Sequence, residues 1–236
     1  MPTEPAETGL AGVVVAVDGP SGSGKSSTAR GVAEQLGLRY LDTGAMYRAM
    51  TWQMLLDGID VSNERAVSQR AESVELESAT DPVNPGIWLG GVDVSREIRT
   101  AETTTSVSQV SAVSRVRELL VVRQREIIAD GGIVVEGRDI GTVVAPDAAL
   151  KIYLSADPAA RASRRSAELT GEQARDVATV EADLVRRDSY DSTRTTAPLS
   201  AAEDAVVLDT TNMAVDEVIA TVVALARERV ATGDDG

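Results

Sequence analysis

The feature that most constrains this chain is a glycine-rich segment between an apolar run and a helical pattern. Residues 13–17 are apolar and mostly β-branched, which is typical of a strand buried on both faces. Residues 25–36 place apolar side chains at helical spacing, and Gly37 follows them as a stop signal. The connecting residues 19–26 match the phosphate-binding consensus G-x-x-x-x-G-K-[ST] in the strand-to-helix context that it requires. The sequence therefore predicts a phosphate-binding turn after the first strand.

This turn can bind a triphosphate through its backbone and two of its side chains. Glycines allow backbone angles that aim consecutive N–H groups inward, and the helix adds the positive end of its dipole. Lys25 supplies positive charge to the β- and γ-phosphates, and the Ser26 hydroxyl can bind Mg²⁺. We therefore expect ATP with Mg²⁺ here, bound by Gly19, Pro20, Ser21, Gly22, Ser23, Gly24, Lys25, Ser26 and Ser27.

Composition excludes several classes of chemistry and partner. The chain has no histidine and no cysteine, which excludes a Ser-His-Asp triad, a cysteine nucleophile and zinc bound by His or Cys. A net charge of −14 and an aromatic content of 3% argue against nucleic acid as a partner. No apolar run approaches the length of a membrane span, and residues 1–12 lack the features of a secretory signal. We therefore expect a cytoplasmic protein.

Alternating strand and helix patterns predict an α/β fold with a parallel sheet of about five strands and helices on both faces. The expected strands are residues 13–17, 38–41, 133–135, 149–154 and 205–208, and the expected helices are 25–36, 45–56, 105–130, 158–169, 172–187 and 215–225. Between residues 70 and 99, alternating apolar residues and turn signals predict a small antiparallel meander.

The same pass along the chain predicts its domain organisation. Residues 1–12 are expected to form a flexible tail, and residues 13–236 a single domain built around the phosphate-binding turn. Within that domain we expect an insert at 58–104, which contains the meander, and a polar, arginine-rich helical segment at 157–187.

Arginines indicate where the phosphoryl group goes. The chain lacks the guanine motif N-K-x-D, the L-S-G-G-Q motif and an acidic D-E-x-x box after an apolar strand. A kinase that phosphorylates a second phosphate must neutralise several anionic oxygens, and guanidinium groups suit that task. Such an acceptor oxygen is already ionised, so no general base is required. The candidate arginines are Arg48, Arg99, Arg117, Arg138, Arg161, Arg164, Arg165, Arg187 and Arg194.

Further segments make the chain resemble a known family. Residues 41–48 read Leu-Asp-Thr-Gly-Ala-Met-Tyr-Arg, residues 136–144 read Glu-Gly-Arg-Asp-Ile-Gly-Thr-Val-Val, and residues 187–194 read Arg-Asp-Ser-Tyr-Asp-Ser-Thr-Arg. With the phosphate-binding turn, these segments resemble those of bacterial cytidylate kinases, the CMP/dCMP branch of the nucleoside monophosphate kinases. The resemblance runs in family order over nearly the whole chain. It implies that residues 13–236 form a single P-loop kinase domain, with a monophosphate-binding insert at 58–104 and a helical lid at 157–187. It implies transfer of the ATP γ-phosphate to CMP or dCMP, with nucleotides as the partners and a monomeric protein.

The resemblance implies that three groups of residues bind CMP. One group holds the acceptor phosphate, a second reads the cytosine edge, and a third contacts the ribose hydroxyls. A carboxylate suits the cytosine amino group, as it does in DNA recognition. The phosphate group is Arg48, Arg138 and Arg194; the base group is Asp139, Arg117 and Ser108; and the ribose group is Asp191 and Arg187. Thr43 is also expected to bind CMP; it stands where the family often has serine and keeps the hydroxyl. Glu136, where the family sometimes has aspartate, is left without a role.

The resemblance also implies catalytic roles for lysine and arginine. Lid arginines would approach the ATP phosphates while Lys25 binds them from the turn. Arg161, Arg164 and Arg165 share one face of the predicted lid helix, which favours a common role. The expected catalytic residues are Lys25, Arg138, Arg187, Arg161 and Arg165.

Three alternatives stay open on the sequence. Another small-molecule P-loop kinase, acting on a uridylate, a sugar acid or shikimate, would share the phosphate-binding turn. A non-catalytic ATP-binding regulatory module would share it as well. A nucleic-acid-stimulated ATPase is disfavoured by the acidic balance of the chain.

Overall fold

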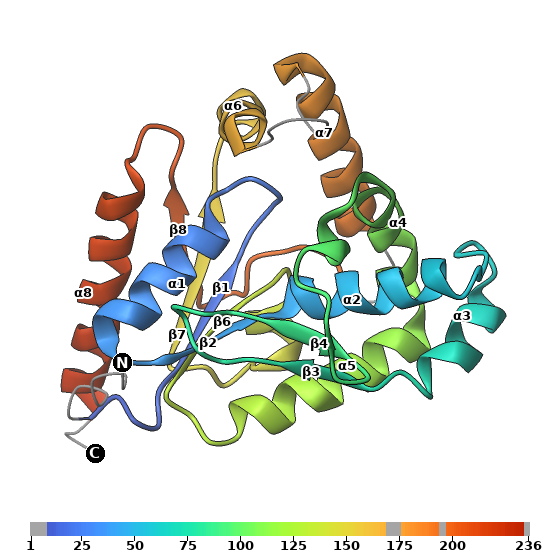
Figure 1. Ribbon diagram of the computed structural model, residues 1–236. Helices are drawn as coiled ribbons and strands as arrows, with labels where there is room; N and C mark the ends of the chain where they lie inside the picture. The colour runs from blue at the N-terminus through green and yellow to red at the C-terminus, as the bar shows by residue number, and fades with distance from the viewer. Residues whose placement is uncertain (1–8, 169–175, 194–196, 234–236) are drawn as a thin grey trace.

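The centre of the fold is a five-stranded parallel sheet (Figure 1). The computed structural model describes residues 9–168, 176–193 and 197–233. The strand order is β2-β6-β1-β7-β8, so all five expected strands are present and the α/β fold class is confirmed. The strands are β1 (Val14–Asp18), β2 (Arg39–Asp42), β6 (Ile133–Glu136), β7 (Leu150–Ser155) and β8 (Val206–Asp209).

Helices cover both faces of the sheet and divide the core into two layers (Figure 1). Along β1, Val15 and Val17 face one layer and Ala16 faces the other, because side chains alternate along a strand. The first layer contains α1 (Lys25–Leu36) and α8 (Val215–Gly233). The second contains α2 (Thr43–Leu56), α4 (Ala101–Ala112) and α5 (Ser114–Ile128). None of the described helices is long and apolar enough to cross a bilayer.

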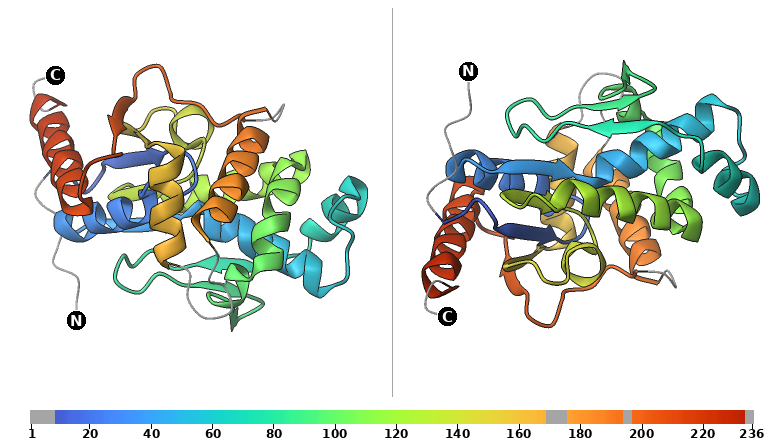
Figure 2. Two further views of the ribbon diagram at one scale, coloured as in Figure 1. Left: turned by 90° about the horizontal axis from the view of Figure 1, so that it is seen from above. Right: turned by 90° about the horizontal axis from the view of Figure 1, so that it is seen from below.

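The predicted meander is confirmed as a separate antiparallel sheet that packs on α2 (Figure 2). Its strands are β3 (Leu76–Ser78), β4 (Ile87–Leu89) and β5 (Val92–Asp93), followed by the short helix η1 (Glu97–Arg99). The Tyr40 N–H donates to the Thr80 carbonyl at 2.8 Å, which ties the meander to the edge strand β2. The sequence analysis missed helix α3 (Glu64–Ala71), a short polar helix whose start is capped by the Asn63 side chain.

Two expected helical segments differ from the structure. The single helix expected at 105–130 is two helices, because Val113 is extended (φ −66°, ψ 117°) and separates α4 from α5. In the segment expected to form a lid, α6 (Pro158–Glu168) packs against α7 (Val177–Thr193), which continues six residues past the expected end at 187. Residues 169 and 172–175 of the expected lid helices lie outside the described residues.

The end of the segment 1–12, which was expected to be a flexible tail, is anchored to the core. Residues 1–8 lie outside the described part of the chain, but Leu10 is buried in the core beside α1 and α8. Its carbonyl accepts from the Val13 N–H at 3.0 Å, just before β1 begins. The sequence missed this anchor because one apolar residue among polar neighbours carries no periodicity.

Asp18, the last residue of β1, holds the loop that follows β6. Its carboxylate accepts hydrogen bonds from the backbone N–H groups of Ile140, at 2.9 Å, and Gly141, at 2.8 Å. Arg138 and Asp139 lie immediately before these amides, so Asp18 fixes their backbone relative to β1. Burial raises the pKa of Asp18 from 3.8 to about 6, although the two backbone hydrogen bonds oppose that rise.

The raised pKa of Asp18 predicts a stability that falls as pH rises. A group whose pKa is higher in the folded state contributes stability below its unfolded value, here 3.8, and loses it as pH passes about 6. Between about pH 5 and 7.5, we expect the unfolding free energy of the wild type to fall by roughly 1 kcal/mol relative to Asp18→Asn. Urea unfolding of both proteins at each pH measures this difference. A difference that does not change with pH would contradict the raised pKa.

Candidate active site

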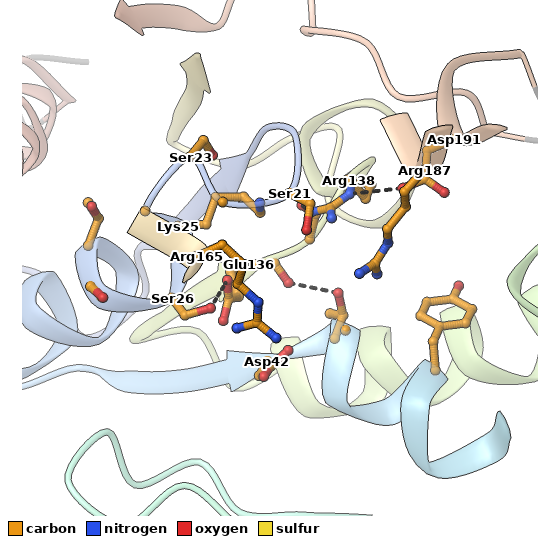
Figure 3. Close-up of a pocket in the computed structure, with 18 of the residues that line it drawn as sticks. Ser21, Ser23, Lys25, Ser26, Asp42, Glu136, Arg138, Arg165, Arg187 and Asp191 are labelled. Atoms are coloured by element: carbon orange, nitrogen blue, oxygen red, sulfur yellow. Dashed lines mark hydrogen bonds and ion pairs between the residues drawn. The ribbon is translucent and has the colours of Figure 1, made fainter. Parts of the chain in front are cut away.

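A cavity of about 490 Å³ opens at the carboxyl ends of the central strands, where parallel α/β sheets usually bind ligands. The glycine-rich turn forms one side of it, the start of α2 and one face of α4 form another, and helices α6 and α7 lie above the sheet in the view of Figure 1. Figure 3 shows side chains that line the cavity. Its polar lining includes Ser21, Ser23, Lys25, Ser26, Asp42, Thr43, Tyr47, Arg48, Arg99, Thr104, Ser111, Arg117, Glu136, Arg138, Asp139, Arg164, Arg165, Arg187 and Asp191.

The glycine-rich turn has the backbone of an anion-binding loop. Gly22 and Gly24 adopt positive φ angles of 77° and 88°, which other residues rarely adopt. Helix α1 starts directly after Gly24, so its first N–H groups and its positive dipole end face the cavity. The Lys25 ammonium is buried at the mouth of this loop and donates to the Pro20 carbonyl at 2.6 Å. Burial and the nearby Arg138 lower the pKa of Lys25.

Glu136 joins the turn to the sheet, a role that the sequence analysis left open. The Ser26 hydroxyl donates to its carboxylate at 2.9 Å (Figure 3). The Tyr40 hydroxyl donates to the other carboxylate oxygen. Burial raises the pKa of Glu136, with a smaller effect from the neighbouring Asp42, while Lys25 opposes the rise. The contact between Ser26 and Glu136 puts a hydroxyl and a carboxylate side by side at the edge of the phosphate loop. Both are oxygen groups of the kind that can bind a hard cation such as Mg²⁺.

A buried ion pair forms the end of the cavity beneath α4. Arg117 on α5 donates to the carboxylate of Asp139, and these residues are 3% and 4% exposed. The guanidinium of Arg117 also lies 5.4 Å from the ring centroid of Tyr47 and donates to the Ser111 carbonyl at 3.3 Å. A buried pair of this kind presents charged hydrogen-bonding groups in fixed positions, which suits recognition of a polar planar group.

Several arginines line the cavity between these two ends. Arg48 donates to the Asp42 carboxylate at 3.0 Å, and Arg99 lies 3.9 Å from the same oxygen. Arg138 donates to the Asp191 carboxylate at 3.2 Å and to the Gly19 carbonyl at 3.0 Å. Burial, together with the charge of Arg138, lowers the pKa of Arg187 to about 10. Positive charges this close repel one another, and an anion bound between them would relieve that repulsion.

Most of the site residues expected from the sequence line this cavity. Within the described part of the chain, four expected residues do not line the cavity: Gly19, Pro20, Ser108 and Arg161. Arg194 lies outside the described residues. Helix α4 presents Thr104, Val107 and Ser111 to the cavity, while the carbonyl of Ser108 accepts from the Ser111 hydroxyl at 3.0 Å.

Three lining residues deserve comparison with the sequence analysis, which gave them no role in the site. Glu136 ends the apolar strand β6 and pairs with Val17 of β1 in the parallel register. The sequence signal for a site residue here was a single acidic residue directly after the apolar run 133–135. Asp42 ends β2 beside Glu136 in the same register. Tyr47 lies one turn into α2 and had only its place in the 41–48 segment as a signal.

Nearly the whole chain is similar in sequence to proteins of one known family. A sequence profile of the family described as Cytidylate kinase matches residues 15–228. The chain belongs to the cytidylate kinase family. A cytidylate kinase of Streptomyces griseus subsp. griseus is 53% identical over 228 residues, which cover 95% of this chain and 97% of that protein. One of Streptomyces coelicolor is 53% identical over 230 residues, covering 97% and 96%.

A solved structure agrees with this fold. A protein from Eubacterium ventriosum described as uncharacterized superposes with a TM-score of 0.50 at 11% identity, covering 92% of this chain and 98% of that one. At that identity the likeness concerns the fold alone. The cytidylate kinase family resemblance inferred from residues 41–48, 136–144 and 187–194 is confirmed by the family match, which contains all three segments.

Proposed function

We propose that this member of the cytidylate kinase family transfers the γ-phosphate of ATP to CMP and to dCMP, giving ADP and the nucleoside diphosphate. The observation that carries the proposal is one cavity with two different ends. A glycine-rich phosphate loop lies at one end and the buried Arg117–Asp139 pair at the other, with arginines between them. A phosphate loop alone would serve many kinases, and the second end distinguishes an acceptor that carries both a phosphate and a polar base.

At the donor end, the proposed role of Lys25 is to bind the β- and γ-phosphates. Its ammonium now donates to the Pro20 carbonyl, a bond that an incoming phosphate oxygen can replace with a stronger, charged one. Arg164 and Arg165 line the cavity from α6 and are the lid arginines proposed to neutralise phosphate charge. Arg164 would exchange its bond to the Thr210 carbonyl for a charged one to phosphate. Exclusion of water by the lid favours transfer to the acceptor over hydrolysis.

At the acceptor end, the proposed partner of the cytosine amino group is Asp139. A carboxylate accepts from that amino group, while the Arg117 guanidinium can donate to a ring acceptor on the same edge. Uracil would place a carbonyl oxygen against the carboxylate, an unfavourable meeting of two acceptors in a buried site. Arg48 and Arg138 are the proposed ligands of the acceptor phosphate, and Arg187 with Asp191 is the proposed ribose contact, as the family resemblance implies.

The chemistry needs no general base. The attacking oxygen belongs to a phosphate that is already ionised near neutral pH, so the protein has to align it and neutralise charge. Arg138 suits this role because it lies between the phosphate loop, through the Gly19 carbonyl, and the acceptor side, through Asp191. The arginines therefore supply electrostatic stabilisation where negative charge gathers between the two nucleotides.

The residues present fit a magnesium ion bound with ATP. Ser26 and Glu136 supply a hydroxyl and a carboxylate in contact at the edge of the phosphate loop, and Mg²⁺ prefers such oxygen ligands. Ser26 is the proposed direct ligand, and Glu136 is proposed to orient it. When bound, the ion would neutralise charge on the β- and γ-phosphates.

A coupled assay of ADP release tests the proposal. With ATP and Mg²⁺, turnover is expected with CMP and dCMP, much less with UMP and AMP, and least without an acceptor. A sugar acid or shikimate supporting the fastest turnover would favour another small-molecule kinase. ADP release that is the same with and without acceptors would contradict phosphoryl transfer to a nucleotide. A monomeric state and a cytoplasmic location stay predictions.

A further inference from the structure

One carboxylate of the lid binds the phosphate loop without lining the cavity. Asp188 lies on α7, and one of its oxygens accepts from the backbone N–H of Ser21 at 3.1 Å. The other oxygen accepts from the guanidinium of Arg161 on α6. Asp188 therefore connects both described lid helices to the loop that is proposed to bind ATP. The partners are 167 and 27 residues away in the sequence, so only the tertiary structure brings them together.

Arg161 completes this connection from the outer side of the loop. It is 5% exposed, and its guanidinium donates to the carbonyls of Ser21 and Ala156, each at 3.0 Å. A Cβ at Gly22 would come within 3.2 Å of the Arg161 side chain, so the loop and this side chain are in close contact. The lid thus binds both the N–H and the C=O of Ser21. We name Ser21, Arg161 and Asp188 the lid clasp.

Helix α7, which carries Asp188, also carries two residues that are proposed to bind the acceptor nucleotide. Arg187 precedes Asp188, and Asp191 follows it by three residues, close to one helical turn. Both line the cavity, and Asp191 binds Arg138, which in turn donates to the Gly19 carbonyl. Helix α7 is therefore attached to the phosphate loop at two points. A change in the position of Ser21 must move the backbone that carries Arg187 and Asp191, unless the clasp opens.

We propose that Asp188 is a positioning residue through which the ATP-binding loop and the CMP pocket are coupled, so that either nucleotide strengthens binding of the other. This inference rests on the proposed function, because it assigns the two ends of the cavity to these two nucleotides. The clasp holds α7 in one place relative to the loop, and a nucleotide that orders one side reduces the cost of ordering the other. Such coupling is reciprocal and typically amounts to about 5- to 150-fold in affinity.

Calorimetric titration of CMP, with and without the Mg²⁺ complex of a non-hydrolysable ATP analogue, measures the coupling. The wild type is expected to bind CMP about tenfold more tightly with the analogue present. Asp188→Ala is expected to reduce this ratio to about one, while the affinity for each nucleotide alone changes little. Asp188→Asn keeps an oxygen for the Ser21 amide and loses the charge that pairs with Arg161, so an intermediate ratio is expected.

Asp183→Ala on the same helix is the matched control. Asp183 binds Arg186 at 3.0 Å and does not line the cavity, so its removal is expected to leave the coupling ratio unchanged. A wild-type ratio kept in both Asp188 variants would overturn the proposal, even if their thermal stability fell, because the clasp would then be structural only. A wild type that phosphorylates CMP without any coupling would overturn the proposal and leave the function standing. A wild type that neither binds nor phosphorylates CMP would overturn both.

Discussion

Replacement of Lys25 by alanine is expected to lower kcat by about 10³-fold, the upper end of what loss of one charged or hydrogen-bonding group at a transition state costs. Lys25 is the only lysine in the cavity lining of the described residues, and its ammonium lies where the phosphate loop and Arg138 meet. The fold should persist, because alanine fits the first turn of α1 and the lysine contributes a buried charge at a cost in solvation. Steady-state ADP release with CMP, together with thermal melting, measures both effects.

Lys151→Met is the matched control for this experiment. Lys151 is the only other lysine of the chain, and it binds Asp204 at 2.8 Å on β7, away from the cavity lining. Its removal is expected to affect stability and to leave kcat near the wild-type value. Near-normal turnover in Lys25→Ala would exclude the lysine from phosphoryl transfer. Equal loss of turnover in both variants would point to loss of positive charge in general.

Replacement of Asp139 by asparagine is expected to reduce the preference for CMP over UMP by about 10²-fold in kcat/KM. The carboxylate is the proposed acceptor for the cytosine amino group, whereas an asparagine amide can also donate to the uracil carbonyl. The side chain is buried, so water cannot compensate for a mismatched partner. The measurement is kcat/KM for CMP and for UMP in wild type and variant.

The buried position of Asp139 requires a second comparison. Without its charge, Arg117 is left as an unpaired buried cation, which costs about 3 to 5 kcal/mol when one partner of such a pair is removed. The double variant Asp139→Asn/Arg117→Met removes both charges and separates this loss of stability from the loss of base selection. Glu72→Gln, which breaks an exposed ion pair with Arg115, should leave the CMP-to-UMP ratio unchanged. An unchanged CMP-to-UMP ratio in Asp139→Asn would contradict the proposed base contact.

Much of the fold could be predicted because its signals are local. The apolar run of β1, the helical spacing of α1 and the stop at Gly37 all lie within a few residues of the features they specify. The alternating residues of the insert predicted β3, β4 and β5 for the same reason. Helix α3 and the break at Val113 were missed, since a short polar helix has a weak apolar period and one extended residue leaves the surrounding helical spacing nearly intact.

The candidate site was predictable where its residues follow one another along the chain. Lys25 and Ser26 occupy fixed places in the phosphate-binding consensus, and both line the cavity. Ser108 was chosen on α4 by resemblance, whereas Ser111 faces the cavity, because the direction of α4 depends on its packing against α2. Glu136 was given no role because its partners, Ser26 and Tyr40, lie about a hundred residues earlier in the chain.

The sequence by itself determined the phosphate loop, the five strands of the main sheet, the meander and the family, because backbone preference, hydrophobic period and ordered motifs are local or linear properties. Only the tertiary structure decided which polar groups lie within hydrogen-bond distance of each other. Asp18 holds the loop of Arg138 and Asp139, and Asp188 reaches Ser21 across 167 residues. Hydrogen bonds need partners within about 3 Å, and sequence separation carries no information about that distance. The register of the parallel sheet and the packing of helices α6 and α7 set these distances.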